Sequence, residues 1–394
     1  MKSFIKLLGI IALTAVIGFT LITCGNNGGG GGGGDSDPGG KPENPKPFNN
    51  ITASQLVANI KIGWNLGNTL DASGLFWLPD NAPVSDLETA WGNSVTTKAN
   101  ITAVKNAGFN AIRIPVSWTK AADANYNIRA DWMARVIEIV DYAVENDMYI
   151  LLNTHHEEEV FKFTDVQKAQ SLAAFKKIWE QIADAFKNYN EKLVFEALNE
   201  PRTIGAAHEW VGGNDEERAN LNEHYKVFVE TVRASGGNND KRILMINTYA
   251  ASKEAVAMDG LVIPSDSASN KIIVSFHAYE PFDFAHEPSG TNTWDSLNPP
   301  DTEAITIPID NFCGKFVNAG IPVIIGEFAA LNKNNLSSRV EWADFFISYA
   351  TSKGIKCFWW DPGKDPTDVG EMSVLNRNDN TFPIPELIAA LIKG

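Results

Sequence analysis

Residues 193–201 read LVFEALNEP, and this stretch decides the fold prediction. A short, almost continuous apolar run holds one glutamate and then ends in Asn-Glu-Pro. Similar runs recur after helical stretches at intervals of about 30 to 50 residues, which leaves room for a crossover connection between parallel strands. Such runs are typical of parallel strands buried on both faces. Besides Leu193–Asn199, the runs are Ile62–Leu66, Ala111–Pro115, Tyr149–Asn153, Ile243–Asn247, Ile272–Phe276, Pro322–Ile325 and Ile355–Trp360.

The segments between the runs predict the crossover helices. In residues 172–189, apolar side chains recur every three or four positions, as on one face of a helix. Gly108, Gly320 and Gly354 stand where helices should end before the next strand. Eight such units predict a single α/β domain over residues 48–394, a (β/α)8 TIM barrel. A doubly wound open sheet is the alternative, although Gly63–Asn68 lacks its G-x-G-x-x-G fingerprint.

The N-terminal residues predict an export signal and a tether. Two lysines precede the apolar run Leu7–Ile22, so residues 1–23 are typical of a signal peptide. The run ends in LITC, which resembles a bacterial lipobox and makes Cys24 the expected lipidation site. Plain secretion or an uncleaved anchor remain alternatives. Residues 24–47 are rich in Gly and Pro and predict a flexible linker. We therefore expect an extracytoplasmic protein, either a cell-surface or outer-membrane lipoprotein or a secreted one.

Composition narrows the class of protein. The chain has 394 residues, of which 44% are hydrophobic and 21% are charged, as in a soluble globular protein. Its formal charge of −15 is unfavourable for nucleic-acid binding and leaves a neutral substrate such as a sugar open. Cys313 and Cys357 do not make a disulfide framework, and the sequence leaves open whether they pair. We expect a monomer whose contact with a membrane is through the N-terminal lipid.

Polar side chains follow the predicted strands at their carboxyl ends, where barrel enzymes place their active sites. Glu200 ends the fourth strand and Glu327 the seventh. Glycoside hydrolysis needs such a pair: one acid protonates the leaving oxygen, and the other carboxylate attacks the anomeric carbon or activates water. A separation of about 5 Å would indicate retention, and about 6.5–9.5 Å inversion. The further candidates at this rim are Arg113, His155, His156, Asn199, His277, Tyr279 and Trp360.

The motifs as a set resemble glycoside hydrolase family 5, and the resemblance covers nearly all of residues 51–394. The wording of GWNLGNTLDA and LNTHHE is similar to the subfamily of endo-β-1,4-glucanases that also includes xyloglucanases, lichenases and some xylanases. The motifs that carry the resemblance are GWNLGNTL (63–70), IRIPVSW (112–118), LLNTHHE (151–157), FEALNEP (195–201), HAY (277–279), IIGEF (324–328) and FWWD (358–361).

The resemblance implies a retaining endo-β-1,4-glucanase in which Glu200 is the acid/base and Glu327 the nucleophile. Arg113 is then expected beside Glu327, and Trp360 beneath the sugar that is cleaved. We expect the pKa of Glu200 to be raised while the nucleophile is charged. The resemblance implies substrate-binding roles for Asn68, Arg113, His155, His156, Asn199, His277, Tyr279 and Trp360.

Other functions remain open at this point. A mannanase is an alternative within the same family. A barrel that binds polysaccharide without cleaving it is a non-enzymatic alternative. A metal-dependent hydrolase is suggested by His155–Glu159, which reads HHEEE. However, adjacent histidines on a strand point to opposite faces, and H-E-x-x-H spacing is absent from the sequence. We therefore expect no metal and no cofactor.

The tryptophans and Glu196 complete the predictions. Glu196 has the parity of Glu200 on the fourth strand and is expected inside the barrel as a paired structural carboxylate. Trp359 is expected to pack on the opposite face of its strand from Trp360. Four tryptophans on predicted strands or helices should be core: Trp64, Trp132, Trp179 and Trp342. Four in predicted loops are candidate sugar platforms: Trp77, Trp91, Trp210 and Trp294.

Overall fold

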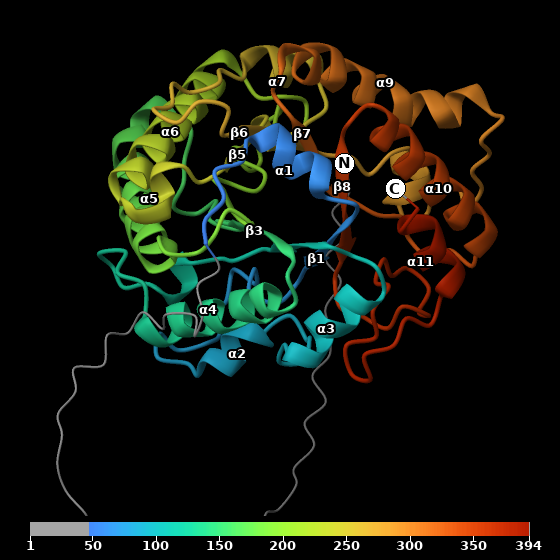
Figure 1. Cartoon of the computed structure of the whole chain (residues 1–394), viewed down its shortest axis with the longest axis horizontal. Helices are drawn as coiled ribbons and strands as arrows, with labels where there is room; N and C mark the ends of the chain where they lie inside the picture. The colour runs from blue at the N-terminus through green and yellow to red at the C-terminus, as the bar shows by residue number, and fades with distance from the viewer. Residues whose placement is uncertain (1–46, 394) are drawn as a thin grey trace, which may run out of the picture. The chain divides into compact units, whose positions relative to one another are not determined.

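The computed structural model describes residues 47–393, so the predicted signal peptide, Cys24 and the linker up to residue 46 lie outside the described residues. Eight strands close into a barrel in the order of the chain, and every neighbouring pair is parallel (Figure 1). The TIM-barrel prediction is confirmed, and the open-sheet alternative is wrong. The strands are β1 Gly63–Leu66, β2 Ala111–Ile114, β3 Tyr149–Asn153, β4 Leu193–Glu196, β5 Leu244–Asn247, β6 Ile272–His277, β7 Val323–Phe328 and β8 Lys356–Asp361.

Helices surround the barrel (Figure 1). Gly108, Gly320 and Gly354 have φ values of 111°, 84° and 74°, so they end the preceding helical segments in a conformation that glycine adopts at low cost. No helix among residues 47–393 is long and apolar enough to cross a membrane. The α-helices are α1 Ala53–Asn59, α2 Val84–Glu88, α3 Lys98–Asn106, α4 Ala130–Glu145, α5 Asp165–Phe186, α6 Asp215–Ala234, α7 Ala255–Gly260, α8 Phe282–Ala285, α9 Pro299–Lys315, α10 Leu336–Ser352 and α11 Pro385–Leu391. Short 3-10 helices are η1 Thr119–Ala121, η2 Gly237–Asp240, η3 Tyr249–Ala251 and η4 Val317–Ala319.

Strand β4 ends at Glu196, three positions before the predicted end at Asn199. The reason lies in the next strand. The side-chain amide of Asn247, at the end of β5, donates to the main-chain oxygens of Leu198 and Asn199. These carbonyls therefore have a side-chain partner in place of a ladder partner, and the chain turns away before Glu200.

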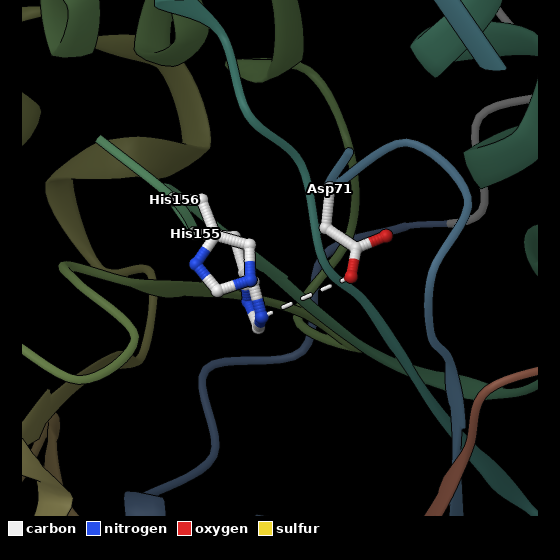
Figure 2. A group of neighbouring side chains, drawn as sticks. All are labelled: Asp71, His155 and His156. Carbon is white, nitrogen blue, oxygen red and sulfur yellow. Dashed lines mark ion pairs between the residues drawn. The ribbon is translucent and has the colours of Figure 1, made fainter. Parts of the chain in front are cut away.

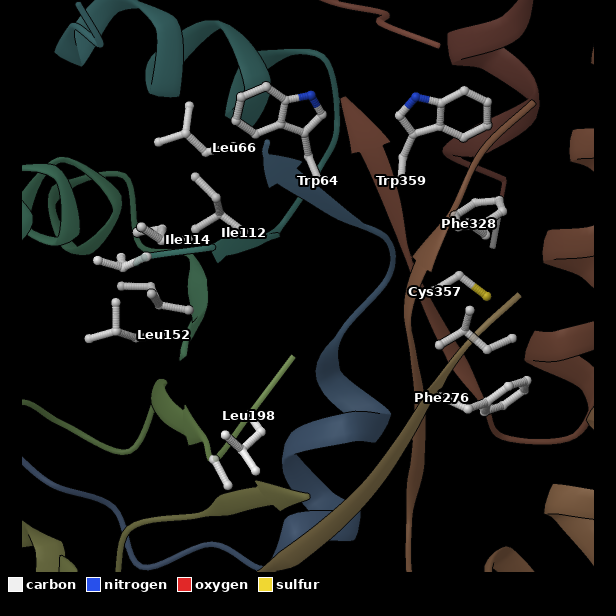
Figure 3. Packing of buried hydrophobic residues seen from close by; sticks show 14 of the residues in the cluster. Trp64, Leu66, Ile112, Ile114, Leu152, Leu198, Phe276, Phe328, Cys357 and Trp359 are labelled. Atoms are coloured by element: carbon white, nitrogen blue, oxygen red, sulfur yellow. The ribbon is translucent and has the colours of Figure 1, made fainter. Parts of the chain in front are cut away.

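Outward-facing strand residues pack against the helices, and the inward-facing ones fill the barrel. Figure 3 shows Trp64, Ile112 and Trp359 among the side chains of the outer layer. The position after each of these is Asn65, Arg113 or Trp360, as the alternation of a strand requires. The core prediction for four tryptophans is confirmed, because each is 0% exposed: Trp64, Trp132, Trp179 and Trp342.

The amino ends of the strands are closed by an apolar layer. Leu56, Val57 and Ile60 from the α1 region pack with inward-facing strand residues such as Met245 and Phe358. In Figure 1, α1 lies over the middle of the ring of helices. The two cysteines of this part of the chain, Cys313 and Cys357, are both free thiols, so they do not pair.

Candidate active site

The carboxyl ends of the strands surround a cleft of about 620 Å³. Eight of the ten residues predicted for the site line it. These are His155, His156, Asn199, Glu200, His277, Tyr279, Glu327 and Trp360. Arg113 is fully buried and contacts the lining residues Asn199 and Glu327. Asn68 is not among the lining residues; its backbone N–H donates to Asp71, and its carbonyl accepts from Asn93.

The two glutamates approach each other across the cleft, with His277 between them. The Nδ1 atom of His277 lies 2.8 Å from Oε1 of Glu200 and 3.6 Å from Oε2 of Glu327. One carboxylate oxygen of each glutamate and a ring nitrogen of His277 all lie within 4.8 Å of one another. Strand β7 carries Glu327 directly, whereas Glu200 is presented by the turn after β4.

Arg113 binds two carboxylates at once beneath the cleft. Its Nη1 donates to Oε1 of Glu327 at 2.7 Å, and its Nε donates to Oε2 of Glu196 at 2.7 Å. Burial lowers the pKa of the guanidinium, but the charges of Glu196 and Glu327 outweigh burial and raise it. The expected neighbour of Glu327 and the expected pairing of Glu196 are both confirmed. The pair of buried carboxylates leaves this site with one uncompensated negative charge when both are ionised.

Tyr279 holds the other oxygen of Glu327. Its hydroxyl donates to Oε2 at 2.8 Å. Burial and the adjacent charge of Glu327 raise the pKa of Tyr279 well above its ordinary value, so the phenol remains a hydrogen-bond donor. With Arg113 on one oxygen and Tyr279 on the other, the carboxylate of Glu327 has a fixed orientation.

The pKa of Glu200 contradicts the sequence prediction. Burial raises it, but the hydrogen bond from His277 and the positive charges of His277, Arg202 and His156 outweigh burial and leave it lowered. The prediction considered the negative charge of Glu327 alone. It missed the cations, because three separate loops and strands bring them to one carboxyl group.

His155 and His156 do not point to opposite faces, so that expectation is wrong. Strand β3 ends at Asn153, and the alternation of a strand no longer applies to the two histidines that follow. Their rings lie 4.5 Å apart at 85°, and both line the cleft. The opposite orientation of the two histidines, which argued against a metal from the sequence, is therefore absent. The argument for or against a metal depends on the potential ligand atoms themselves.

Asn153 fixes which nitrogen of His155 carries the proton. Its Oδ1 accepts from the backbone N–H of Val116, so its Nδ2 donates to Nδ1 of His155 at 3.1 Å. Burial, followed by neighbouring positive charges, lowers the pKa of His155 well below its ordinary value, so the ring is neutral. The proton of the neutral ring is therefore on Nε2, which lies 3.9 Å from Oδ2 of Asp71 (Figure 2).

Asp71, His155 and His156 bring three ligand-type atoms within 4.8 Å of one another. A metal would need a lone pair on His155 Nε2, where the tautomer places a proton. The oxygens of Asp71 already accept from the backbone N–H groups of Asn68 and Thr69. This hydrogen bonding favours a role for His155 Nε2 as a donor to a sugar hydroxyl over a role as a cation ligand. The expectation that the protein uses no metal stays a prediction.

The loop tryptophans differ from one another. Trp210 is 54% exposed and lines the cleft, whereas Trp77 is 55% exposed and is not among the lining residues. Trp91 contacts His156, with ring centroids 5.6 Å apart. Trp294 is 3% exposed, so its prediction as a platform is wrong. Its loop folds back on α10, where the indole packs against Phe345.

The sequence analysis did not single out the residues that follow β5, nor Asn247 and Arg202, which contact Glu196 and Glu200. Residues 250–254 line the cleft, but their sequence AASKE carries no recognisable motif. Asn247 is buried and donates to Glu196 at 3.0 Å. Arg202 is directly beside Glu200, and its position after Asn-Glu-Pro could have singled it out.

A closed (β/α)8 barrel that opposes two carboxylates at the carboxyl ends of its strands, in an aromatic-lined cleft, defines the class of glycoside hydrolases. The sequence profile described as Cellulase (glycosyl hydrolase family 5) matches residues 78–365. The chain belongs to this family, and the family prediction is confirmed.

Curated relatives are named as endoglucanases and cellulases. Endoglucanase A of Clostridium longisporum is 41% identical over 346 residues, which cover 87% of this chain and 66% of that protein. Cellulase/esterase CelE of Acetivibrio thermocellus is 44% identical over 347 residues, covering 87% of this chain and 40% of the relative. The chain thus spans less than two thirds of the length of either relative.

Solved structures are matched over almost their whole length. A broad specificity endoglucanase from Ruminococcus champanellensis with bound cellotriose has a TM-score of 0.85 and 44% identity, covering 88% of this chain and 100% of that one. A family 5 lichenase from Caldicellulosiruptor sp. F32 has a TM-score of 0.82 and 41% identity, covering 89% and 96%.

Proposed function

We propose that this chain is a retaining endo-β-1,4-glucanase that cleaves internal linkages of glucan-backbone polysaccharides. The observation that carries the proposal is the distance between Glu200 and Glu327, whose nearest carboxylate oxygens lie within 4.8 Å. Retaining enzymes hold their carboxyl groups about 5–5.5 Å apart, whereas inverting enzymes leave about 6.5–9.5 Å for a water molecule. This short distance supports a double displacement.

In the first step, the carboxylate of Glu327 attacks the anomeric carbon while Glu200 gives its proton to the leaving oxygen. A covalent glycosyl-enzyme forms and the aglycone leaves as an alcohol. In the second step, Glu200 takes a proton from water, whose oxygen displaces Glu327 and restores the original anomeric configuration. Arg113 and Tyr279 hold Glu327 in the orientation for attack.

Glu200 has to be protonated when the first bond breaks. Its pKa is lowered in the open cleft, and burial is the largest influence that raises it. Bound substrate displaces water from the carboxyl group and strengthens that influence, so we expect the acid form to be favoured in the complex. Once Glu327 is esterified, its negative charge is gone, and Glu200 is free to act as the base.

The surrounding groups fit a sugar ring. Asn199 accepts from Arg113 through Oδ1 at 2.7 Å, which leaves its Nδ2 to donate to the 2-hydroxyl. Trp360 lies parallel to the His155 ring at 5.8 Å and provides an apolar surface under the cleaved sugar. These contacts would engage the glucan backbone, and the names of the relatives as endoglucanases support that choice.

The experiment measures reducing-end release by residues 35–394 on carboxymethyl cellulose, xyloglucan, barley β-glucan, xylan and mannan. Glu200→Gln is the blank, and Glu303→Gln, on an exposed position of α9, is the matched control. We expect activity on one or more β-1,4-glucans that disappears in the blank and persists in the control. Activity on xylan or mannan alone would contradict the glucan assignment. Binding without any release would favour the non-catalytic barrel.

We also propose that the protein is anchored outside the cytoplasm through a lipid on Cys24. Support comes from the sequence LITC and the glycine-rich stretch that follows it, which would hold the barrel away from the membrane. Cys24→Ser should move the full-length protein from the detergent phase to the aqueous phase with unchanged specific activity. Continued partition into detergent would contradict the lipid.

A further inference from the structure

Arg202 follows the acid/base motif directly and turns back on it. Its side chain is 11% exposed. The Nη1 atom donates to the main-chain oxygen of Glu200 at 2.9 Å and lies 3.7 Å from Oε2 of the same residue. The guanidinium thus contacts both the backbone and the carboxylate of Glu200.

Two further carboxylates hold the guanidinium in place. Glu158, after β3, accepts from Nη1 at 3.1 Å, and Glu209 accepts from Nε at 3.1 Å. Glu158 also binds Nδ1 of His156 at 3.2 Å, and Glu209 accepts the backbone N–H of Gly205 at 2.7 Å. Each of these glutamates has a second hydrogen-bond partner, so the guanidinium is held in place independently of Glu200. It can therefore fix the position of Glu200.

The same guanidinium stacks on Trp210. The Cζ atom lies 4.4 Å from the centroid of the indole ring. Trp210 is 54% exposed and lines the cleft together with Glu200. An aromatic ring joined to the acid/base residue is placed to stack with sugars on the side from which the aglycone leaves.

We propose that Arg202 is a positioning residue that fixes the acid/base Glu200 and ties it to Trp210 as the platform for leaving-group sugars. The proposal rests on the proposed function, in which Glu200 protonates the leaving oxygen. Arg202 therefore matters most for substrates whose leaving group needs that proton. Its positive charge also favours the ionised form of Glu200, so its removal raises the pKa of the acid.

The test compares Arg202→Gln with the parent enzyme on cellotetraose and on 2,4-dinitrophenyl β-cellobioside. The dinitrophenolate leaves without protonation. A positioned general acid contributes about 10²–10⁴-fold, so we expect kcat/KM to fall by about 20-fold or more on cellotetraose and by less than about threefold on the aryl substrate. The alkaline limb of kcat/KM on cellotetraose should move up by at least about 0.5 pH unit.

Arg135→Gln is the matched control. Arg135 also has an 11% exposed side chain and two glutamate partners, but it is not among the residues that line the cleft. Its substitution should leave the ratio of the two substrates and the pH profile unchanged. Arg202→Lys keeps the charge and loses the planar fork, so it should lose activity on cellotetraose with a smaller shift of the alkaline limb.

An equal loss on both substrates with an unmoved alkaline limb would show a merely structural role and overturn the proposal. If Arg202→Gln does not fold, the same substrate ratio is measured on Arg202→Lys, and an unchanged ratio overturns it. Glu200→Gln distinguishes failure of the Arg202 proposal from failure of the proposed function. It should lose cellotetraose cleavage and keep the first step on the aryl substrate. Equal loss of both activities in Glu200→Gln would instead contradict the proposed function.

Discussion

The two ends of the barrel interior are built from the same strands but from opposite kinds of side chain. At the amino end, inward-facing residues such as Val194 and Met245 meet Leu56 of α1 in a layer that is apolar throughout. At the carboxyl end, inward-facing Arg113 and Glu196 form a buried ion pair. Strand β4 contributes Val194 to one layer and Glu196, two positions on, to the other.

The difference separates stability from chemistry. Apolar burial at the amino end contributes to folding through removal of surface from water. Buried charges at the carboxyl end cost desolvation energy that their attraction only partly returns, so they are weak evidence for stability. Their placement makes sense because Arg113 also binds Glu327, whose orientation the proposed reaction depends on.

The largest expected effect is at the carboxyl end. Glu327→Ala removes the proposed nucleophile and should lower kcat on 2,4-dinitrophenyl β-cellobioside by about 10⁴-fold or more. Sodium azide should restore part of the turnover and give an α-glycosyl azide, detected by NMR. Glu196→Gln is the control, because it binds the same arginine and should show no azide-dependent product. Absence of rescue in Glu327→Ala would contradict the nucleophile assignment.

Arg113→Met tests how much the folded protein depends on the cation that pairs with the two buried carboxylates of the charged layer. The substitution leaves Glu196 and Glu327 buried without their cation and should lower the free energy of unfolding by about 3–5 kcal/mol, together with activity. Denaturant unfolding measures the loss. Arg339→Met is the comparison, since Arg339 is also buried and no carboxylate is recorded against it among the described residues. A loss as large there would mean that burial, and not the ion pairs, decides the effect.

Leu56→Ala makes the corresponding test at the amino end. Leu56 is 0% exposed, and its truncation should cost about 3 kcal/mol of unfolding free energy through lost burial and a cavity. The kcat/KM of the folded enzyme should be unchanged, with Ser54→Ala at an exposed position of α1 as control. A fall in kcat/KM at temperatures where Leu56→Ala is fully folded would show that the two ends are coupled.

A smaller, pH-dependent effect should come from outside both layers. His224 on α6 is buried between Ser171 and the carbonyl of Asn220, and burial lowers its pKa to about 4. Below its ordinary pKa of about 6.5, the unfolded chain binds a proton that the folded one does not, so stability falls as the pH falls. Between pH 7.5 and pH 5 this amounts to about 2 kcal/mol.

His224→Gln should therefore lose less stability than the parent over that interval, as measured by urea unfolding at the two pH values. The pH dependence of kcat should be the same in both proteins, because His224 is not among the residues that line the cleft. Identical loss in the two proteins would assign the acid sensitivity to groups other than His224.

Periodicity and strand-end chemistry made the site largely predictable. The apolar runs predict parallel strands, and parallel strands in a barrel bring their carboxyl ends together, so Glu200 and Glu327 could be paired from sequence. The alternation of a strand placed Glu196 inside the barrel, and Arg113 indeed binds it. The prediction for the histidine pair failed for the complementary reason, because β3 stops at Asn153 and the alternation stops with it.

The sequence by itself determined the number and order of the β/α units, the meeting of Glu200 and Glu327 at one rim, and the family. These follow from local patterns that survive without coordinates. Only the tertiary structure decided the lowered pKa of Glu200, the tautomer of His155 and the burial of Trp294. Each of these depends on atoms from segments that are far apart in the chain. Electrostatic and hydrogen-bonding effects act over a few ångströms in space, and the sequence does not state those distances.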